Sequence, residues 1–366
     1  MKTVRVPVAA AALALAACSP DFDPASRIEK LRVLAVRADP PEIAPVPADG
    51  AAAIAPDRAA LTALVLRADF ASDPARGTTL IYLACLPVPG DPTPTPCVAL
   101  ASLSDPTAAL KDAARAACSA PSPGSALTPV AFAGAERCQG GACGPEILDG
   151  AMALPAPAIA LPAGYGFDNL PAGAPDRILG VEAVALVFAI DAEPAELADA
   201  SADCPLAGVA SRLSELWGTR EHVVTVKRVQ VRGPEAPDAP NQNPVIDGIA
   251  VDGAAIADGA PPALQTGKRQ LTPVLPDGAD ALREPYTKLD AAGVPIESKR
   301  EEWVYSWFST AGDLKDLHTR DPDPAEEWTL GTGDAGAGAT RALLAAVVRD
   351  LRGGEAWTVR EVTIVR

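Results

Sequence analysis

The sequence predicts a mainly β protein with two β-sandwich domains, and three observations support this fold class. Short segments rich in Val, Leu, Ile and Thr alternate with turns rich in Pro, Gly and Asp, which is the pattern of strands and their connections. The segment 234–244, PEAPDAPNQNP, is almost free of apolar side chains and suits a stiff, solvated linker. Every cysteine precedes residue 205, so the part of the chain before this linker contains cysteines and the part after it contains none. The expected domains are therefore 28–233 and 245–366.

An export signal is expected before the first domain. Lys2 and Arg5 precede an apolar run over 6–17, which is the layout of a secretory signal and is shorter than the ~20 residues of a membrane span. The residues that end this run, Leu15-Ala16-Ala17-Cys18, resemble the lipobox of bacterial lipoproteins. That resemblance implies removal of residues 1–17 and attachment of a diacylglycerol and a further acyl chain such as palmitate to Cys18. An ordinary signal peptide with a nearby structural cysteine is the alternative.

The same resemblance implies a place in the cell envelope. Ser19 follows the lipidated position, and in lipoproteins a residue other than Asp there favours the outer membrane over the inner one. Residues 18–27 form the expected tether, and nine residues between Cys18 and Ile28 reach at most about 30 Å. The first domain is therefore expected close to the lipid surface.

Five segments of the first domain have the composition of strands. Between the third and the fourth lies a region over 87–177 that is dense in Pro and Gly, and we expect it to be an irregular, partly helical insertion. Asp105 and Pro106 suit the start of a helix that reaches about Cys118. A second helical stretch ends at Trp217, before Gly218. The predicted strands are 28–38, 60–70, 78–86, 178–190 and 222–233.

The second domain resembles an extracellular sandwich of the Ig-like or PKD-like type. The resemblance rests on Tyr305-Ser306-Trp307 in the predicted strand 301–309 and on a final hairpin with Arg349-Asp350 and Gly353-Gly354 at its turn. Further strands are predicted at 245–253, 343–350 and 357–365. The first domain resembles a second Ig-like sandwich with a cysteine-bearing insertion. The whole layout is similar to envelope lipoproteins of GC-rich Gram-negative bacteria, which implies no particular activity.

The cysteines other than Cys18 are even in number, and in an oxidising compartment they predict up to three disulfides. The spacing favours Cys85 with Cys97, because only eleven residues separate them and Pro-rich turns bring the ends together. Six cysteines allow 15 pairings, so the other two pairs stay less certain than the first. They are Cys138 with Cys143 and Cys118 with Cys204.

No motif for a cofactor or a metal site stands out. His222 and His318 fall in different domains, whereas a histidine triad or a zinc site needs its members together. The three glycines of GTGDAG, 331–336, match a dinucleotide fingerprint but lack the βαβ context that it requires. The acidic residues of 313–327 lack the spacing of an EF-hand and suit a solvated loop, with calcium binding left open.

Three aromatic residues alternate along the strand 301–309. Trp303, Tyr305 and Trp307 share one face, which is either an exposed glycan platform or the core of the sandwich. We favour the core, because aromatic residues make up only 4% of the chain and few other large side chains are available to fill it. The opposite face, Val304-Ser306-Phe308, is expected to be partly solvated.

The net charge of the chain narrows the range of possible partners. Without residues 1–17 the chain has 29 basic and 47 acidic residues, a formal charge of −18 that disfavours nucleic acid as a partner. We expect a membrane-anchored envelope lipoprotein with a non-enzymatic binding or structural role and no cofactor. An envelope protein or a glycan would be its partner. The alternative is an envelope hydrolase that uses carboxylates of the insertion over 87–177.

Overall fold

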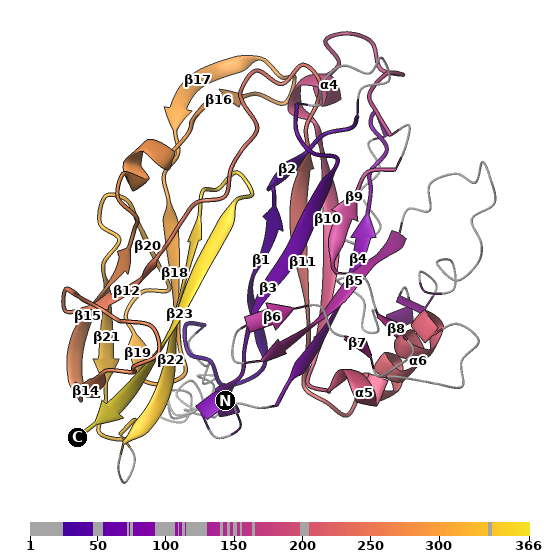
Figure 1. Ribbon diagram of the computed structural model, residues 1–366. Coiled ribbons are helices and arrows are strands. Elements are labelled where there is room, and N and C mark those ends of the chain that lie inside the picture. The colour runs from indigo at the N-terminus through magenta and orange to yellow at the C-terminus, as the bar shows by residue number, and fades with distance from the viewer. Residues whose placement is uncertain are drawn as a thin grey trace, which may run out of the picture.

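The computed structural model describes residues 25–46, 54–71, 73, 76–91, 156–162, 165–197, 205–335 and 339–366, together with parts of 107–153. It is mainly β, as predicted, and its strands form several sheets in two halves that lie side by side (Figure 1). In the described part of the chain, no helix is long and apolar enough to span a membrane.

The N-terminal half contains a three-stranded and a six-stranded sheet. Their inner faces enclose a core in which Tyr82, Ile159 and Phe167 are almost completely buried. The smaller sheet has the order β1 (Arg32–Asp39), β3 (Arg58–Leu66) and β9 (Ala158–Ala160). The larger sheet has the order β2 (Glu42–Ile43), β11 (His222–Val231), β10 (Val181–Ile190), β4 (Thr78–Cys85), β5 (Val130–Gln139) and β6 (Ala142–Gly144).

Helices cover the outer face of the six-stranded sheet. Along β10, Val184, Leu186 and Phe188 face α5 (Pro194–Leu197) and α6 (Pro205–Trp217), whereas Ala185 and Val187 face the inner core. Both faces of this strand are therefore buried from Ala183 onward, which explains the unbroken apolar run over 183–190. Helix α6 ends at Trp217 as predicted.

Two features of this half differ from expectation. Residues 178–179 belong to helix α4 (Pro175–Leu179) and not to the predicted strand, because Pro175 favours a helix start and Gly180 ends the helix at φ 73°. The region 87–177 is not only an insertion, because β5 pairs with β4 and β9 pairs with β3. Its other described elements are helical residues within 107–114, strand β6, the start of α4 and the small hairpin β7 (Ile147–Leu148) and β8 (Met152–Ala153).

The C-terminal half consists of two five-stranded sheets packed face to face and a separate hairpin. One sheet has the order β13 (Ala254–Ala255), β12 (Gly248–Val251), β15 (Gly267–Val274), β21 (Glu326–Leu330) and β19 (Asp313–Leu314). The other has the order β14 (Ala263–Gln265), β23 (Glu355–Val365), β22 (Thr340–Arg349), β18 (Val304–Ser309) and β20 (His318–Arg320). The hairpin is β16 (Pro285–Leu289) and β17 (Pro295–Arg300), and a short 3₁₀ turn, η2 (Ala279–Leu282), precedes it. The corresponding turn of the N-terminal half, η1 (Ala68–Ala71), follows β3.

The aromatic row lies in the core between these two sheets, as predicted. Trp303 and Tyr305 are 0% exposed and Trp307 is 1% exposed, so the three rings offer no platform to a glycan. The prediction for the opposite face of β18 was wrong, because Phe308 and Ser306 are buried there as well. The reason is that the outer face of the β18–β22–β23 sheet packs against the N-terminal half.

The contact between the halves has an apolar centre and buried polar contacts. Leu34 and Leu64 of the three-stranded sheet pack on Phe308 and Leu343. The segment between the halves was predicted to be a solvated linker, but part of it is buried: Asn241 is 2% exposed and donates a hydrogen bond to Asp350. Buried polar groups between the halves are therefore expected to fix how they sit against each other.

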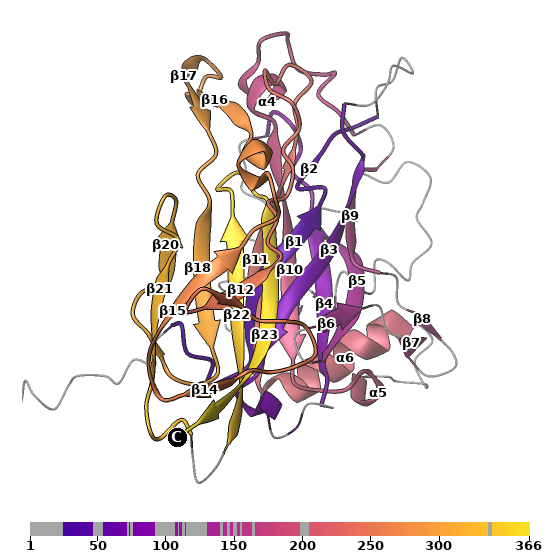
Figure 2. The ribbon, with the colours of Figure 1, turned by 60° about the vertical axis from the view of Figure 1, so that its left-hand side comes forward.

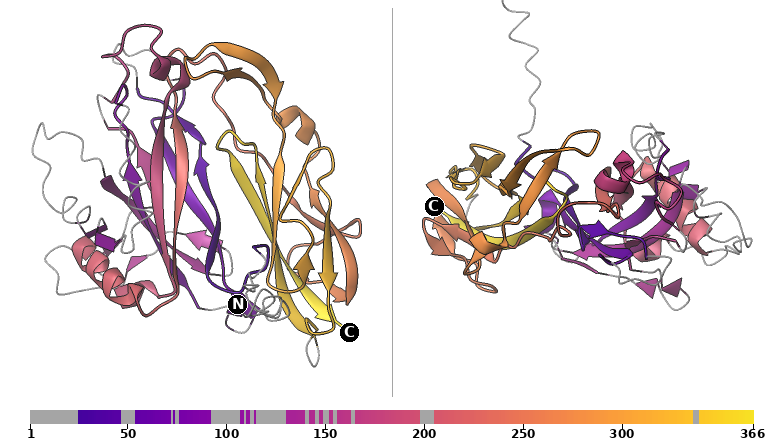
Figure 3. Two further views of the ribbon diagram at one scale, coloured as in Figure 1. Left: turned by 180° about the vertical axis from the view of Figure 1, so that it is seen from behind. Right: turned by 90° about the horizontal axis from the view of Figure 1, so that it is seen from above.

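The molecule has two ends, which are defined by the segments that lie there. Residues 25–31 lie at one end, which we call the proximal end, where the amide of Ile28 donates to the carbonyl of Ser309 at the finish of β18. We call the opposite end, to which β1 runs, the distal end (Figures 1 and 2). It comprises the ends of β2 and β4, the start of β3, α4, segment 233–244, the β16–β17 hairpin and the β22–β23 turn. Figure 3 shows from behind that the hairpin reaches α4, and Gly293 packs on Ile178 there.

Candidate functional site

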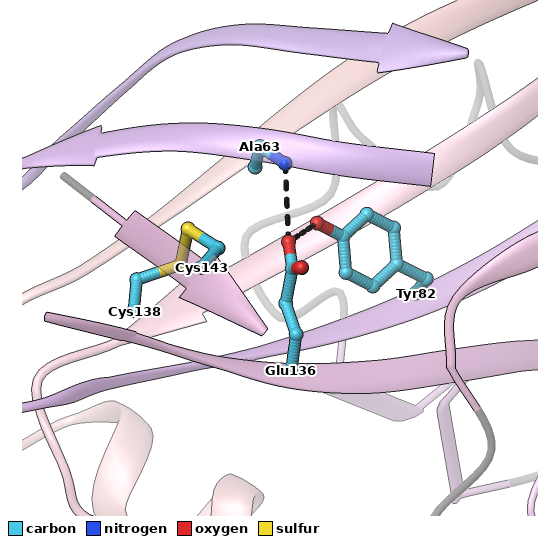
Figure 4. Close-up of a disulfide and its surroundings, with 5 residues drawn as sticks. All are labelled: Ala63, Tyr82, Glu136, Cys138 and Cys143. Carbon is cyan, nitrogen blue, oxygen red and sulfur yellow. Dashed lines mark hydrogen bonds between the residues drawn. A yellow bond between two sulfur atoms is a disulfide. The ribbon is translucent and has the colours of Figure 1, made fainter. Parts of the chain in front are cut away.

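One buried carboxylate lies in the region that the hydrolase alternative invokes. Glu136 of β5 is 3% exposed and points from the six-stranded sheet toward β3 (Figure 4). Its Oε1 accepts hydrogen bonds from the Tyr82 hydroxyl and from the amide of Ala63, the latter at 3.1 Å. Strand β3 pairs with β9 only as far as Ala60, so this carboxylate satisfies a backbone donor beyond the end of that pairing.

The surroundings of Glu136 shift its protonation. Burial raises the pKa of this carboxyl to about 7, while the hydrogen bonds from Tyr82 and Ala63 act in the opposite direction. Burial and the neighbouring carboxylate also raise the pKa of the Tyr82 hydroxyl, which therefore remains a proton donor in the hydrogen bond. Glu136 is expected to exchange its proton near neutral pH.

We expect Glu136→Gln to remove a pH dependence from the stability of the protein. The native pKa of about 7 lies above the ordinary value of 4.5, so the native state binds more protons than the unfolded state between these values. Stability conferred by the protonated carboxyl is present below the unfolded pKa and is lost as the pH rises through the native pKa, by about 3 kcal/mol. Urea unfolding at about pH 4.5 and about pH 8 should show this loss in the wild type and not in Glu136→Gln.

Glu193→Gln is the matched control. Its pKa is lowered and not raised, chiefly by a hydrogen bond from Arg137, and its carboxylate lies outside the core. This variant should keep the wild-type loss of stability toward high pH. Parallel pH curves for the wild type and Glu136→Gln would contradict the assignment of this dependence to Glu136.

A disulfide lies beside Glu136. Cys138 and Cys143 face each other across the β5–β6 pair and are bonded, as the sequence predicted. Cys85 is also in a disulfide, but the predicted partner, Cys97, lies outside the described residues. The same holds for Cys18, Cys118 and Cys204, so lipidation at Cys18 and the pair Cys118–Cys204 stay predictions.

The candidate catalytic groups do not form a recognisable centre in the described part of the chain. The one group of three potential metal ligands found there is Glu136 with Cys138 and Cys143, whose sulfurs are bonded to each other. Glu136 lines none of the three cavities described below. The hydrolase alternative therefore gains no support from this carboxylate.

The two histidines are in separate halves. His222 opens β11 and stacks on Trp217 with 4.1 Å between ring centroids. His318 Nδ1 lies 2.8 Å from Ser306 Oγ, a contact that the sequence did not suggest. Arg349 donates a hydrogen bond to the same oxygen, and burial and the charge of Arg349 lower the pKa of His318. Ser306 is 1% exposed, which keeps it out of reach of a substrate.

The acidic segment 313–327 lines an open cavity of about 410 Å³. Glu326 is 2% exposed there and accepts a hydrogen bond from the amide of Asp316 at 2.8 Å. Lys268, Arg269 and Lys315 line the same cavity, so cations as well as acids surround it. Among the described residues of this segment, no three carboxylates bring their oxygens within 4.8 Å of one another. The structure thus shows no converging calcium ligands here, and Gly336 of the glycine motif lies outside the described residues.

Two further cavities lie at the distal end and share Arg232 as a lining residue. One, of about 340 Å³, is mainly apolar and includes Val46, Ile54, Tyr165 and Phe167. The other, of about 330 Å³, lies between the halves beside the β16–β17 hairpin and is lined by apolar side chains and by several charged ones. They include Glu42, Asp238, Lys288 and Arg352.

Arg232 lies between these two cavities and is fixed by several polar contacts. Its guanidinium is 7% exposed, pairs with Glu42 at 3.2 Å and donates to the carbonyls of Ala236 and Ala239 in the segment between the halves. On the side of the C-terminal half, Arg352 pairs with Glu301 at 2.9 Å and stacks over the Tyr286 ring. Both arginines that line this second cavity are therefore paired with carboxylates.

Exposed apolar side chains concentrate at the distal end. Six of the eight large, exposed apolar residues in the described part of the chain belong to segments of this end, and the other two are Val226 and Leu282. Contacts place these segments together: the carbonyl of Pro87 accepts a hydrogen bond from Tyr165, and Arg352 lies 3.9 Å from Glu42. The six are Val46, Ile54, Val88, Val294, Ile296 and Leu351, each between 52% and 71% exposed. Sequence alone did not reveal this surface, because its members are far apart along the chain.

Comparisons with known proteins assign this chain to no family. No family model and no curated protein matches it. Among solved structures, it is similar to a nucleoside hydrolase-related hypothetical protein from Saccharophagus degradans that is associated with carbohydrate metabolism, with 13% identity over 42% of this chain and a TM-score of 0.20. Escherichia coli alpha-2-macroglobulin matches in its elastase-activated form, with 9% identity over 94% of this chain and a TM-score of 0.22. Its native form matches with 11% identity over 92% of this chain and a TM-score of 0.21.

The chain spans only part of each of these solved chains, 38%, 22% and 17% of their lengths respectively. At these scores the likeness carries no argument about function. The evidence for a function therefore comes from the residues themselves, and above all from the distal end.

Proposed function

We propose that this protein is a lipid-anchored, non-enzymatic protein of the bacterial cell envelope that binds a partner protein through its distal end. The observation that carries this proposal is the concentration of exposed Val, Ile and Leu side chains at that end. Apolar side chains gathered at one end of a protein mark interaction sites more often than scattered ones do. A protein partner suits aliphatic side chains, whereas a glycan platform would need exposed aromatic rings, and the aromatic row of β18 is buried.

The proposed anchor and the binding surface lie at opposite ends. Cys18 precedes Ala25, the first described residue, by seven positions, a reach of at most about 25 Å. Lipid on Cys18 would hold the proximal end near the membrane, with the outer membrane favoured over the inner. Strands β1 and β3 run between the ends over eight and nine residues, about 26–30 Å of extended chain. The distal end would then face away from the lipid surface.

Site-specific photo-crosslinking in membranes of the native host tests the binding surface. A photo-reactive residue at Val46 or Ile296, 63% and 58% exposed, should give one discrete cross-linked protein of the same mass from both positions. Val226, 37% exposed in the middle of β11, is the matched control and should give no such product. Equal products from all three positions, or none from the two distal ones, would overturn the proposed surface.

Cys18→Ala tests the anchor separately. The wild type should incorporate a fatty-acid analogue and sediment with membranes, because three acyl chains anchor firmly. The variant should lose the label and stay unprocessed or soluble. Label that persists in Cys18→Ala would show that the anchor was assigned wrongly, without bearing on the distal surface.

A further inference from the structure

The two residues of the Cys138–Cys143 disulfide differ in burial. Cys138 is 3% exposed and belongs to the inner core of the N-terminal half, whereas Cys143 is only partly buried. The two cysteines stand opposite each other in adjacent strands, β5 and β6. A thiolate that approaches from solvent would therefore meet the Cys143 sulfur first and would leave Cys138 as the departing sulfur.

Glu136 lies beside this departing sulfur. A carboxylate oxygen of Glu136 and both sulfur atoms are all within 4.8 Å of one another (Figure 4). Glu136 and Cys138 share a face of β5, because side chains two residues apart along a strand point the same way. Arg137 lies between them, faces the other side of the sheet and bonds to Glu193 at 2.8 Å. Tyr82 is the titratable side chain of β4 that contacts the carboxyl, and β3 contributes a backbone amide.

We propose that Cys138–Cys143 is a thiol–disulfide exchange site in which the carboxyl of Glu136 transfers a proton to and from the sulfur of Cys138. The co-reactant is a dithiol, either a small molecule or a dithiol protein of the envelope. Cys138 pairs with Thr78 at the start of β4, whereas the distal surface includes the end of that strand, so this site is separate from the proposed binding surface and the inference does not depend on the proposed function.

The exchange balances in two steps. A thiolate of the dithiol attacks Cys143 Sγ, the Cys138–Cys143 bond breaks, and its electron pair passes to Cys138 Sγ, which takes the proton of Glu136. The second thiolate of the dithiol then attacks the mixed disulfide and releases Cys143 as a thiolate, which takes a proton from water. The protein gains two electrons and two protons, and the dithiol becomes a disulfide. Glu136 recovers its proton from solvent, and oxidation of the protein follows the same steps in reverse.

The need for a proton donor follows from burial. A thiolate at Cys138 would be a bare charge inside an apolar core, which is unfavourable unless it is neutralised as it forms. A donor is most effective when its pKa lies near the working pH, and burial raises the pKa of Glu136 to about 7. The carboxyl is therefore able both to give a proton during reduction and to take one during oxidation.

The rate of reduction by dithiothreitol tests the proposal in the intact mature protein. The Cys138–Cys143 bond is followed by alkylation and mass spectrometry between about pH 5.5 and 8.5, with each rate divided by the concentration of reductant thiolate. In the wild type this rate should be constant below about pH 7 and should fall about tenfold per pH unit above it, as Glu136 loses its proton. In Glu136→Gln it should be independent of pH and about tenfold lower at about pH 6.

Two controls accompany this measurement. Glu193→Gln alters a carboxylate on the other face of the sheet and should keep the wild-type profile. The disulfide of Cys85 is the second control, because Cys85 is 0% exposed and this bond has no Glu136 carboxyl beside it. Its thiolate-corrected rate of reduction should not change slope near about pH 7 in any variant. The profile of the wild type alone is decisive, so the test stands even if a variant folds poorly. A thiolate-corrected rate that does not change with pH in the wild type would overturn the proposal.

Discussion

Replacing Trp307 with alanine is expected to lower the free energy of unfolding by about 3–5 kcal/mol and to unfold the C-terminal half at lower urea than in the wild type. The indole is 1% exposed and lies in the core with Trp303 and Trp328, so its removal leaves a large cavity. Its Nε1 also donates to Thr319 Oγ1 at 2.8 Å, and that hydrogen bond between β18 and β20 would be lost. Urea unfolding followed by tryptophan fluorescence and by circular dichroism measures the change.

Val294→Ala provides the control for this measurement. Its side chain is 56% exposed in the β16–β17 hairpin, and a surface change of this kind should alter stability by less than about 0.5 kcal/mol. If Trp307→Ala unfolds like the wild type but loses binding to cell-wall glycans, the aromatic row serves recognition and not packing. The burial of all three rings makes the loss of stability the expected result.

The sequence predicts best those elements whose evidence is local. The hairpin of β22 and β23, the end of α6 at Trp217 and the Cys138–Cys143 pair all depend on residues close together in the chain, and the structure contains each of them. The burial of Trp303, Tyr305 and Trp307 also followed from a local alternation combined with the scarcity of other aromatic residues. Such patterns fix which face of a strand is apolar, because side chains alternate with period 2.

What the sequence does not predict is which distant element covers a given face. The face of β18 that includes Phe308 was expected to be partly solvated, but Leu34 and Leu64, more than 240 positions earlier, pack on Phe308. The contact of Glu136 with Tyr82 and Ala63 was missed for the same reason, since these residues lie on three different strands. Strand β5 was missed because its surroundings are rich in Pro and Gly, and its pairing with β4 determines its structure more than its composition does.

The most consequential of these distant contacts is the ion pair between Lys227 of β11 and Glu355 of β23. Lys227 Nζ lies 2.8 Å from Glu355 Oε1 and 2.8 Å from the carbonyl oxygen of Gly353, and its side chain is 5% exposed. The carboxylate is 14% exposed, and its other oxygen lies 3.7 Å from Arg349 Nε. This pair joins the six-stranded sheet of the N-terminal half to the C-terminal sheet that contains β18, β22 and β23.

We expect Glu355→Ala to cost about 3–5 kcal/mol, because it leaves the Lys227 ammonium buried with a single carbonyl as its partner. The double variant Lys227→Met/Glu355→Leu should recover most of this loss and stay within about 1 kcal/mol of the wild type, since two apolar side chains of similar size need no charged partner. Urea unfolding of Lys227→Met, Glu355→Leu and the double variant yields the coupling energy between the two positions. Hydrogen exchange in Glu355→Ala should also become faster for amides of β1 and β23, which meet at the contact between the halves. Additive effects in the two single variants and the double variant would contradict a direct interaction between Lys227 and Glu355.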